Sequence, residues 1–400
     1  MRGVEPRAEG RFAAALEILE RLVAFDTVSA HSNLDLIDWV AAYLGRFGIA
    51  TTRSSVFAGK ANLFATIGPS ERGGVLLSGH TDVVPVAGQD WTSDPFCLTE
   101  RPGVVGDARL YGRGSADMKG FLALVLALVP EIVERPLAVP LHFAFTHDEE
   151  TGCFGAPALI GALPTGVARP LFAIVGEPTS MQIATAQKGC AFFRTRIIGH
   201  DGHSSAPERG VNAIVAAAEI IAEIGRLHAE AKGRARPESG FDPPYTTLSV
   251  GTISGGTAVN IIARECAFEW DLRTLPDEDA AALKARIDRF IATDLLPRMR
   301  AGYDGASVET ETIVAVPPLL AVSGSPAEAL ARRLTGINTT TTVSFASEAG
   351  LYQQAGIPAI VCGPGSIGVA HQPDEFITRA ELAAGQEFLD RLIQWAATGG

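Results

Sequence analysis

The apolar residues in the first part of the chain follow two alternating spacings. Apolar positions three and four apart, and one long apolar run, predict helices over residues 12–24, 33–47 and 120–129. Short apolar runs predict strands at Val75–Leu77, Leu141–Thr146, Phe172–Val175 and Ala359–Val361. Strands that alternate with helices indicate an α/β fold. We therefore expect a mixed, mostly parallel sheet flanked by helices.

The pattern changes near Lys188, where the spacing predicts one strand, a helix, two strands, a helix and a last strand. These elements are expected at Cys190–Ile198, Val211–Leu227, Thr247–Ile253, Cys266–Arg273, Asp277–Leu296 and Ala306–Val314. This order is the ferredoxin-like βαββαβ arrangement. The sequence therefore predicts an α+β domain at residues 187–315, inserted into a domain formed by residues 1–186 and 316–400.

Composition narrows the class of protein. The 400 residues are 47% hydrophobic and 20% charged, which is typical of a globular chain. The longest uncharged apolar run, Gly120–Pro130, is too short to span a bilayer, and no apolar secretory core follows the N-terminus, so we expect a cytoplasmic protein. The net charge of −12 argues against a nucleic-acid partner, which requires a basic surface.

The five cysteines are scattered and lack CxxC spacing, so the sequence suggests neither a disulfide framework nor a thiolate zinc site. Any metal must therefore be held by histidines and carboxylates. Such residues follow the apolar strands, where the sites of open α/β sheets form. They are His80 and Asp82 after the first strand, Glu149 and Glu150 after the second, and Glu177 after the third.

Each of these residues also has a plain structural interpretation. An HxD pair such as His80 and Asp82 is more often a polar strand end than a ligand with its orienting carboxylate. Glu149 and Glu150 form either a solvated acidic loop or a ligand beside a base, because a nearby cation would relieve the repulsion between adjacent carboxylates. Glu177 follows an apolar strand, where a carboxylate needs a partner.

Two further residues complete the candidate set. Asp117, in a glycine-rich stretch before the buried helix, is an N-cap or a ligand. The stretch lacks both phosphate-loop patterns, GxGxxG and GxxxxGK[ST]. His371 taken alone is more often a loop residue than a ligand. Three carboxylates, two divalent cations and a bridging hydroxide would balance in charge, and mixed imidazole and carboxylate donors favour Zn²⁺, with Co²⁺ as the alternative.

Six stretches together resemble the M20 metallopeptidase and deacylase family, most strongly its acetylornithine deacetylases. They are SGHTDVVP, YGRGSADMKG, THDEETGCFGA, VGEPTS, GHSSAPERGVNAI and GPGSIGVAHQPDEF. The resemblance covers nearly the whole chain and implies a zinc-peptidase-like fold and hydrolysis of N-acetylornithine in arginine biosynthesis. Alternatives are a succinyl-diaminopimelate desuccinylase, a dipeptidase or a general N-acyl amino acid hydrolase. A non-enzyme that binds a small molecule on the same scaffold would not need the intact base and ligand set.

The resemblance also implies a role for each site residue. The implied ligands are His80 and Glu177 for one metal, Glu150 and His371 for the other, and Asp117 as the bridge. Asp82 would orient His80, and the peptide bond after Asp117 would be cis. Glu149 would be the general base that takes a proton from a water between the metals and delivers it to the leaving amine.

The inserted domain resembles the lid and dimerisation domain of the family, which implies a homodimer. His203 would reach the site of a partner subunit and stabilise the oxyanion, although alone it reads as a surface turn histidine. Asn260 and Arg273 would hold the substrate carboxylate. Glu348 matches an acidic position within a Thr-Glu-Ala stretch, with Ser347 in place of the Thr. It would meet the substrate's ammonium group or serve a helix dipole, with equal weight.

Overall fold

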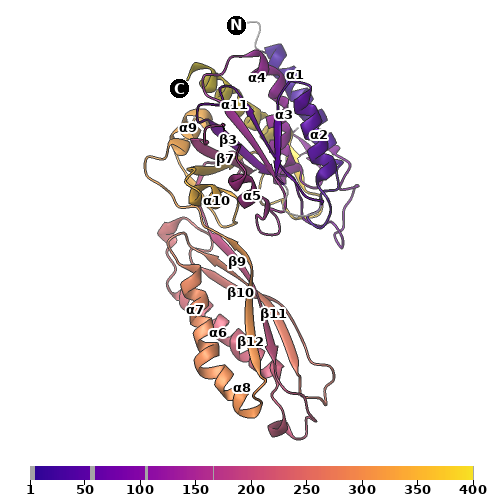
Figure 1. Ribbon diagram of the computed structural model, residues 1–400. Coiled ribbons are helices and arrows are strands. Elements are labelled where there is room, and N and C mark those ends of the chain that lie inside the picture. Colours follow the sequence, from indigo (N-terminus) through magenta and orange to yellow (C-terminus); the bar gives the residue numbers. More distant parts are fainter. Residues whose placement is uncertain (1–4, 55–58, 104–106, 165, 400) are drawn as a thin grey trace. The chain divides into compact units, whose positions relative to one another are not determined.

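The structure is a computed structural model that describes residues 5–54, 59–103, 107–164 and 166–399 (Figure 1). The chain divides into two units. The first unit comprises Met1–Thr185, Ala321–Thr341 and Ser347–Gly400, and the second comprises Ala186–Leu320 and Thr342–Ala346. No helix among the described residues combines the length and apolarity that crossing a bilayer requires.

A sheet of eight strands in the order β1-β2-β6-β3-β7-β14-β8-β13 forms the centre of the α/β part. The strands are β1 (Thr51–Ser54), β2 (Asn62–Ile67), β3 (Val75–His80), β6 (Leu141–Thr146), β7 (Phe172–Pro178), β8 (Ala184–Gln187), β13 (Thr341–Val343) and β14 (Ala359–Gly363). The four neighbours β6, β3, β7 and β14 run parallel, whereas β1, β2 and β8 pair antiparallel. The parallel strands are buried on both faces, which explains their continuous apolar runs.

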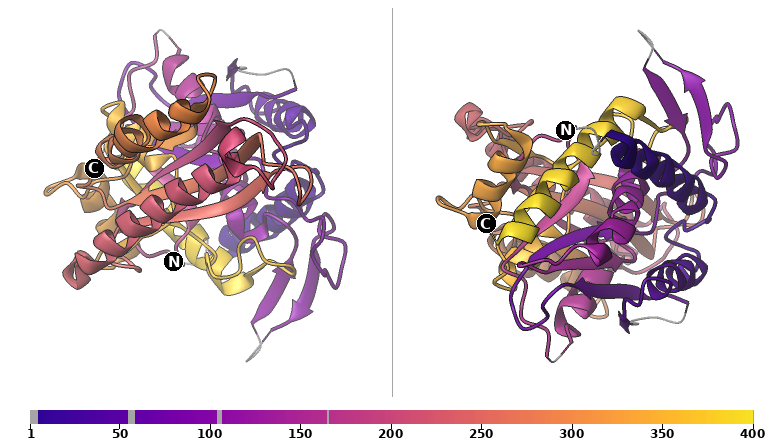
Figure 2. Two further views of the ribbon diagram at one scale, coloured as in Figure 1. Left: turned by 90° about the horizontal axis from the view of Figure 1, so that it is seen from below. Right: turned by 90° about the horizontal axis from the view of Figure 1, so that it is seen from above.

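Helices cover both faces of this sheet. The larger core lies under α1 (Glu5–Val23), α2 (Leu34–Gly45), α3 (Gly120–Ala127), α9 (Pro326–Thr335) and α11 (Arg379–Thr398). Helix α3 continues into α4 (Val129–Glu134), and α1 and α11 both pack against α3 (Figure 2). The opposite face carries α5 (Gly155–Gly161) and α10 (Ala349–Gln354).

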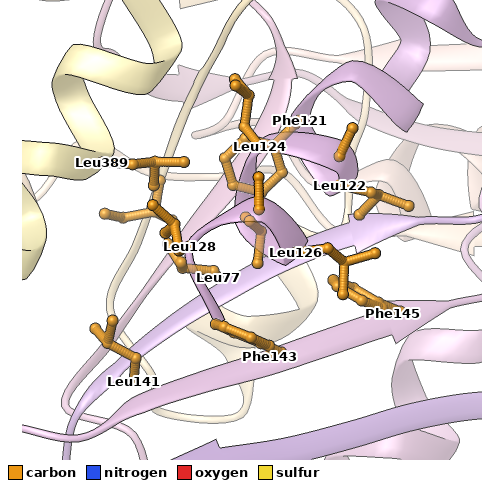
Figure 3. Packing of buried hydrophobic residues seen from close by; sticks show 14 of the residues in the cluster. Leu77, Phe121, Leu122, Leu124, Leu126, Leu128, Leu141, Phe143, Phe145 and Leu389 are labelled. Carbon is orange, nitrogen blue, oxygen red and sulfur yellow. The ribbon is translucent and has the colours of Figure 1, made fainter. Parts of the chain in front are cut away.

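Helix α3 is apolar on every side because it is buried on every side. Figure 3 shows its residues Phe121, Leu122, Leu124 and Leu126 among side chains of the sheet and of α11. Those neighbours include Leu77, Leu141, Phe143, Phe145 and Leu389. Alternate residues of β3 and β6 point to this core, as the period of two in a strand requires.

The second unit is a four-stranded antiparallel sheet in the order β10-β11-β9-β12 with helices packed on it (Figure 2). Its strands are β9 (Gly189–Ile198), β10 (Thr247–Gly255), β11 (Glu265–Thr274) and β12 (Ser307–Val316). Its helices are α6 (Ala213–Gly233), α7 (Ala280–Phe290) and α8 (Leu296–Gly302), with a π-turn at Ile291–Leu295 between the last two. The core includes Phe193 stacked on Trp270. This is the ferredoxin-like order, so the predicted fold class is confirmed.

Smaller elements complete the fold. A three-stranded sheet has the order β15-β5-β4, formed by β4 (Thr99–Pro102), β5 (Ala108–Tyr111) and β15 (Phe376–Thr378). Short 3₁₀ turns lie at Pro207–Arg209 and Pro237–Ser239, and a π-turn at Ser115–Lys119 precedes α3. That turn and strand β15 bring the two ends of the first unit together at the site described next.

Candidate metal centre

The carboxyl ends of three adjacent parallel strands supply most of the candidate residues. His80 is the last residue of β3, Glu149 and Glu150 follow β6, and Glu177 lies near the end of β7. Neighbouring parallel strands end at the same edge of a sheet, where α/β sites form. The turn at Ser115–Lys119 adds Asp117 to this edge, and the loop after β14 adds His371. The two histidines and three candidate ligand carboxylates therefore meet in the first unit.

Asp117 lies between the two imidazoles. Its Oδ1 is 3.1 Å from Nε2 of His80, and its Oδ2 is 3.3 Å from Nε2 of His371. Nε2 of His371 is also 3.1 Å from Oε2 of Glu150, and Nε2 of His80 is 3.9 Å from Oε1 of Glu177. Each imidazole therefore faces Asp117 and one further carboxylate, which is the geometry of two ligand groups that share one bridge.

The donor set fits two divalent cations. Two groups of residues could each hold an ion: His80, Asp117 and Glu150 form one, and His80, Glu149 and Glu177 form the other. Within each group, the possible ligand atoms all lie within 4.8 Å of one another. The carboxylates of Asp117 and Glu177 are buried, and Oε1 of Glu177 lacks a hydrogen-bond partner among the described residues. Burial of a carboxylate without a partner is costly, so these groups need positive charge. Nitrogen and oxygen donors in this number suit Zn²⁺-type ions.

The pKa values of these residues reflect the close packing of several carboxyl groups. Burial and the negative charge of Asp117 raise the pKa of Glu150 to about 7, against the hydrogen bond from His371. Hydrogen bonds to Asp117 and Glu150 raise the pKa of His371 to about 10. Burial alone would raise the pKa of Asp117, but hydrogen bonds from His371 and His80 hold it below its ordinary value. The carboxylates around the two imidazoles therefore favour positive charge at this place.

Glu149 has surroundings different from those of its neighbour Glu150. Its Oε1 accepts a hydrogen bond from the thiol of Cys153 at 3.3 Å, and no imidazole among the described residues pairs with it. Burial raises the pKa of Glu149 well above the ordinary value, and the charges of Glu150 and Asp117 raise it further. A half-buried carboxyl with a raised pKa beside a ligand group is what a general base requires.

Asp82 contacts both His80 and the loop that carries Glu149 and Glu150. Its backbone carbonyl accepts a hydrogen bond from Nδ1 of His80 at 2.8 Å, whereas its carboxylate lies 3.7 Å from that nitrogen. The carboxylate instead accepts hydrogen bonds from the backbone N–H groups of Glu149 and Glu150, at 3.1 and 3.3 Å, and from Oγ of Ser29. Asp82 therefore orients His80 through the main chain and holds the acidic loop through its side chain.

Local backbone geometry brings Asp117 to the strand ends. Lys119, not Asp117, directly precedes α3, and Asp117 has the non-helical angles φ −119° and ψ 88°, so the N-cap interpretation is wrong. The peptide bond between Asp117 and Met118 is cis, as the resemblance implies. A Cβ at Gly176 would lie 2.2 Å from the ring of Phe121, so glycine there lets α3 approach β7 closely.

Glu348 is buried beside the cluster. Its Oε2 accepts a hydrogen bond from Oγ of Ser78 at 2.9 Å, and that hydroxyl is 2.8 Å from the hydroxyl of Tyr352. Glu348 occupies the N-cap position of α10, but its side chain makes no cap hydrogen bond. The negative charge of Glu348 contributes to the raised pKa of Glu149.

The other three candidates belong to the second unit, whereas the cluster is built by residues of the first. His203 is exposed, and its Nδ1 accepts hydrogen bonds from the backbone N–H and Oγ of Ser205. Asn260 is exposed. Arg273 is partly exposed, with its guanidinium over the ring of Phe192 and near Asp271.

The sequence assigned no role to Glu375 or Cys153, which contact the candidate ligand Asp117 and the candidate base Glu149, or to Arg113, which donates to Glu375. Glu375 and Arg113 stand within motifs of the resemblance, but Glu375 touches a turn about 260 residues earlier in the chain. Spacing along a sequence carries no signal for such a contact.

Comparisons with known proteins show similarity in sequence and in fold. The model of "Peptidase family M20/M25/M40" matches residues 76–395. An acetylornithine deacetylase of Proteus mirabilis is 38% identical over 398 residues, which cover 95% of this chain and 96% of that protein. An M20 family metallo-carboxypeptidase of Sulfolobus solfataricus has a similar fold, with a TM-score of 0.73, 17% identity and coverage of 96% and 99%. A dinuclear metal-binding M20 peptidase of Bacillus subtilis has a TM-score of 0.64, 19% identity and coverage of 96% and 98%.

Proposed function

The chain belongs to peptidase family M20/M25/M40 and is a metal-dependent deacetylase, and from that premise we propose that it removes the acetyl group from N-acetylornithine. The products would be ornithine and acetate. The observation that carries the proposal is the carboxylate of Asp117 between two imidazoles, with the half-buried Glu149 near them. The 38% identity to an acetylornithine deacetylase along nearly the whole chain supports the choice of substrate.

His80 and Glu177 would hold one cation, Glu150 and His371 the other, and Asp117 both. Zn²⁺ fits these donors best, and Co²⁺ is the closest substitute. When bound, the cations would polarise the acyl carbonyl and make water a stronger nucleophile. The carboxylates supply the negative charge that keeps the cations in place, and the ring orientation of His80 is fixed by the Asp82 carbonyl.

Glu149 would move the proton. The Cys153 thiol donates to Oε1, which leaves Oε2 to take a proton from the attacking water. The raised pKa of Glu149 lets the resulting carboxylic acid hold this proton until the amide bond breaks. Glu149 would then deliver the proton to the departing amine nitrogen, which becomes the α-amino group of ornithine.

Residues of the second unit would bind the substrate. Because a backbone N–H donates to Nδ1 of His203, the ring hydrogen lies on Nε2, and this N–H is the donor that a developing oxyanion needs. The partly exposed, planar guanidinium of Arg273 suits bidentate binding of the substrate carboxylate, with Asn260 beside it. In the first unit, Glu348 would meet the ammonium group of the ornithine side chain.

An assay of the released acid, acetate from the acetyl substrates and succinate from the succinyl substrate, tests the substrate. N-acetylornithine should be hydrolysed at a higher kcat/KM than N-acetylleucine or N-succinyl-diaminopimelate, and a chelator should abolish the activity. Glu348→Gln should reduce the preference for N-acetylornithine over N-acetylleucine, because an amide does not pair with an ammonium group as a carboxylate does. Equal kcat/KM for the neutral substrate in the wild-type enzyme would contradict the proposal.

We also propose that the enzyme is a cytoplasmic homodimer. All five cysteines are free in the structure, which suits a reducing compartment. In the second unit, β10 is the outermost strand of its sheet, and residues 251–255 of this strand are exposed. Exposed apolar side chains lie nearby in sequence at Ile253, Val259 and Ile261. An exposed edge strand with apolar residues favours pairing with a second copy.

A further inference from the structure

Glu375 is a buried carboxylate that the proposed reaction does not use. Only 1% of the residue is exposed, and the carboxylate accepts four hydrogen bonds from the turn at residues 113–117. Oε1 accepts from the backbone N–H groups of Ala116 and Asp117, at 2.9 and 3.0 Å. Oε2 accepts from the backbone N–H of Gly114 at 2.9 Å and from the guanidinium of Arg113 at 2.8 Å. Several main-chain N–H groups that converge on one anion form a nest.

This turn needs an external acceptor. Gly114 has a φ of +80°, and Asp117 departs from helical angles, so a regular helical ladder does not continue through the turn. Its N–H groups are buried, and a buried N–H without an acceptor costs free energy. The Glu375 carboxylate supplies the acceptor for three of them. It thereby fixes the main chain at the residue whose side chain faces both imidazoles.

The same network reaches the loop of His371. Arg113 donates to Oε1 of Gln89 at 2.5 Å as well as to Glu375, and Nε2 of Gln89 donates to the backbone carbonyl of His371 at 2.9 Å. The Arg113 guanidinium also faces the ring of Trp91. His371 has a φ of +63°, and half of its side chain is exposed, so the core does not hold this ligand in place.

We propose that Glu375, with Arg113 and Gln89, is a positioning residue. It sets Asp117 and His371 at the distance needed to bind the second cation, which is the one assigned above to Glu150 and His371. It acts on the main chain of both ligands and contacts neither substrate nor cation. The inference rests on the proposed metal centre and assigns a function to the glutamate of the HQPDEF stretch and to the Gln89–Trp91 loop.

The variant Glu375→Gln tests this directly. A glutamine is similar in shape, but its NH₂ group would face N–H donors, so at least one of the hydrogen bonds from the turn is lost. The metal-free protein is titrated with Co²⁺ and followed by calorimetry and by visible absorption of the bound ion. We expect the second cation to bind about 10- to 100-fold more weakly than in the wild-type protein, as for other partners that orient a ligand.

Kinetics separate positioning from general damage. At limiting Co²⁺, kcat of Glu375→Gln should fall while KM for N-acetylornithine stays unchanged, and saturating Co²⁺ should restore most of kcat. The matched control is Glu381→Gln, which alters another carboxylate that accepts a backbone N–H, in the first turn of α11. This control should lower the thermal midpoint without changing Co²⁺ affinity.

Two results would overturn the inference. One is wild-type affinity for both cations in Glu375→Gln, and the other is a loss of kcat that saturating Co²⁺ does not restore. If Glu375→Gln does not fold, the partly exposed Gln89→Leu decides. It leaves the hydrogen bonds of Glu375 in place but removes the one to His371 and those that Gln89 accepts from Arg113 and Trp91, and it should still weaken the second cation several-fold. Wild-type affinity in Gln89→Leu would then overturn the inference. A wild-type chain that binds fewer than two cations would instead contradict the proposed metal centre.

Discussion

At the scale of single residues, adjacent side chains of the same type have different surroundings. Glu150 faces the imidazole of His371, whereas Glu149 contacts the thiol of Cys153. Because consecutive residues of a loop point in different directions, one carboxyl can bind a cation while the next moves a proton. The proposed roles would therefore separate cation binding from proton transfer over a single peptide bond.

The substitution Glu149→Gln should leave both cations bound and lower kcat by about 10²- to 10⁴-fold, the usual contribution of a general base. The amide is nearly isosteric with the carboxylate but accepts no proton from water. Acetate release gives kcat, and elemental analysis gives the metal content. Turnover near that of the wild-type enzyme would exclude Glu149 as the base.

The substitution His371→Ala should reduce the bound metal from two ions to one per chain. The residue lies in a half-exposed loop position, so we expect the fold to tolerate the change. His31→Ala is the matched control, because His31 is a similarly exposed histidine that pairs with Asp26 away from the cluster. Full occupancy by two ions in His371→Ala, measured by elemental analysis, would refute its assignment as a ligand.

His142 should make the protein sensitive to acid. Burial in β6 lowers its pKa from 6.5 to about 4, so the unfolded chain binds more protons between these pH values. The free energy of unfolding should therefore fall as the pH drops from 6.5 towards 4, by about 3 kcal/mol from this residue. His142→Gln keeps a partner for Thr66 but does not titrate.

The difference in unfolding free energy between the wild-type protein and His142→Gln isolates this effect, because all other groups titrate alike in both. Urea unfolding at pH 7, 5.5 and 4 measures it. A difference that stays constant over this range would show that His142 is not held in its neutral form.

Residues in the cluster were predictable to different degrees. Glu150 and Glu177 stand directly after apolar strands, so their place at the sheet edge follows from the sequence. Asp117 and His371 needed the resemblance, because a glycine-rich turn and a surface loop have many interpretations. Glu375 and Cys153 gained their roles only from contacts across the fold.

At the scale of elements, strongly apolar segments were predicted well. The strand Leu141–Thr146 has the predicted bounds, and β7 extends the predicted strand by three residues. Short strands such as β1 and β4 were missed, because four half-exposed residues carry no clear period. The predicted helix Asp277–Leu296 corresponds to α7 and the π-turn at Ile291–Leu295, and helical structure continues beyond it through α8 to Gly302; apolar spacing does not encode the π-turn.

Helix α11 was also absent from the predicted elements, although the sequence carries its start signal. Thr378 and Glu381 form a capping box, in which each side chain accepts a hydrogen bond from the backbone of the other. Thr378→Ala should destabilise the protein by about 1 kcal/mol. Thermal unfolding measures the effect, with the exposed Thr398→Ala near the end of the same helix as the control. Equal midpoints for the two variants would show that the cap contributes nothing.

At the scale of the whole molecule, the second unit interrupts the first between residues 185 and 321. The ligand His371 follows this interruption, whereas the other four candidate ligands precede it. The first unit therefore completes its candidate metal centre only when its first segment, Met1–Thr185, and its last, Ser347–Gly400, come together. Each unit has its own hydrophobic core, which explains why the sequence patterns on the two sides of Lys188 could be interpreted separately.

A homodimer in which His203 serves the site of the partner subunit makes a quantitative prediction. Glu149→Gln chains lack the base but offer an intact His203, and His203→Ala chains have the reverse defect. After subunit exchange in an equal mixture, half of the dimers contain one chain of each kind, and one of their two sites is intact. The mixture should recover about a quarter of the wild-type activity.

The substitution Ile253→Asp tests the surface that would join the subunits. It places a charge on the exposed edge strand β10 and should convert a dimer of 42.0 kDa chains into a monomer, as measured by sedimentation. Thr312→Asp, on the opposite edge strand β12, is the control and should remain dimeric.

The mixture of Glu149→Gln and His203→Ala has an outcome that would contradict the shared site. If the mixture stays inactive although the protein is dimeric and its subunits have exchanged, then His203 does not act across the subunit interface. The oxyanion would in that case need a donor from the same chain.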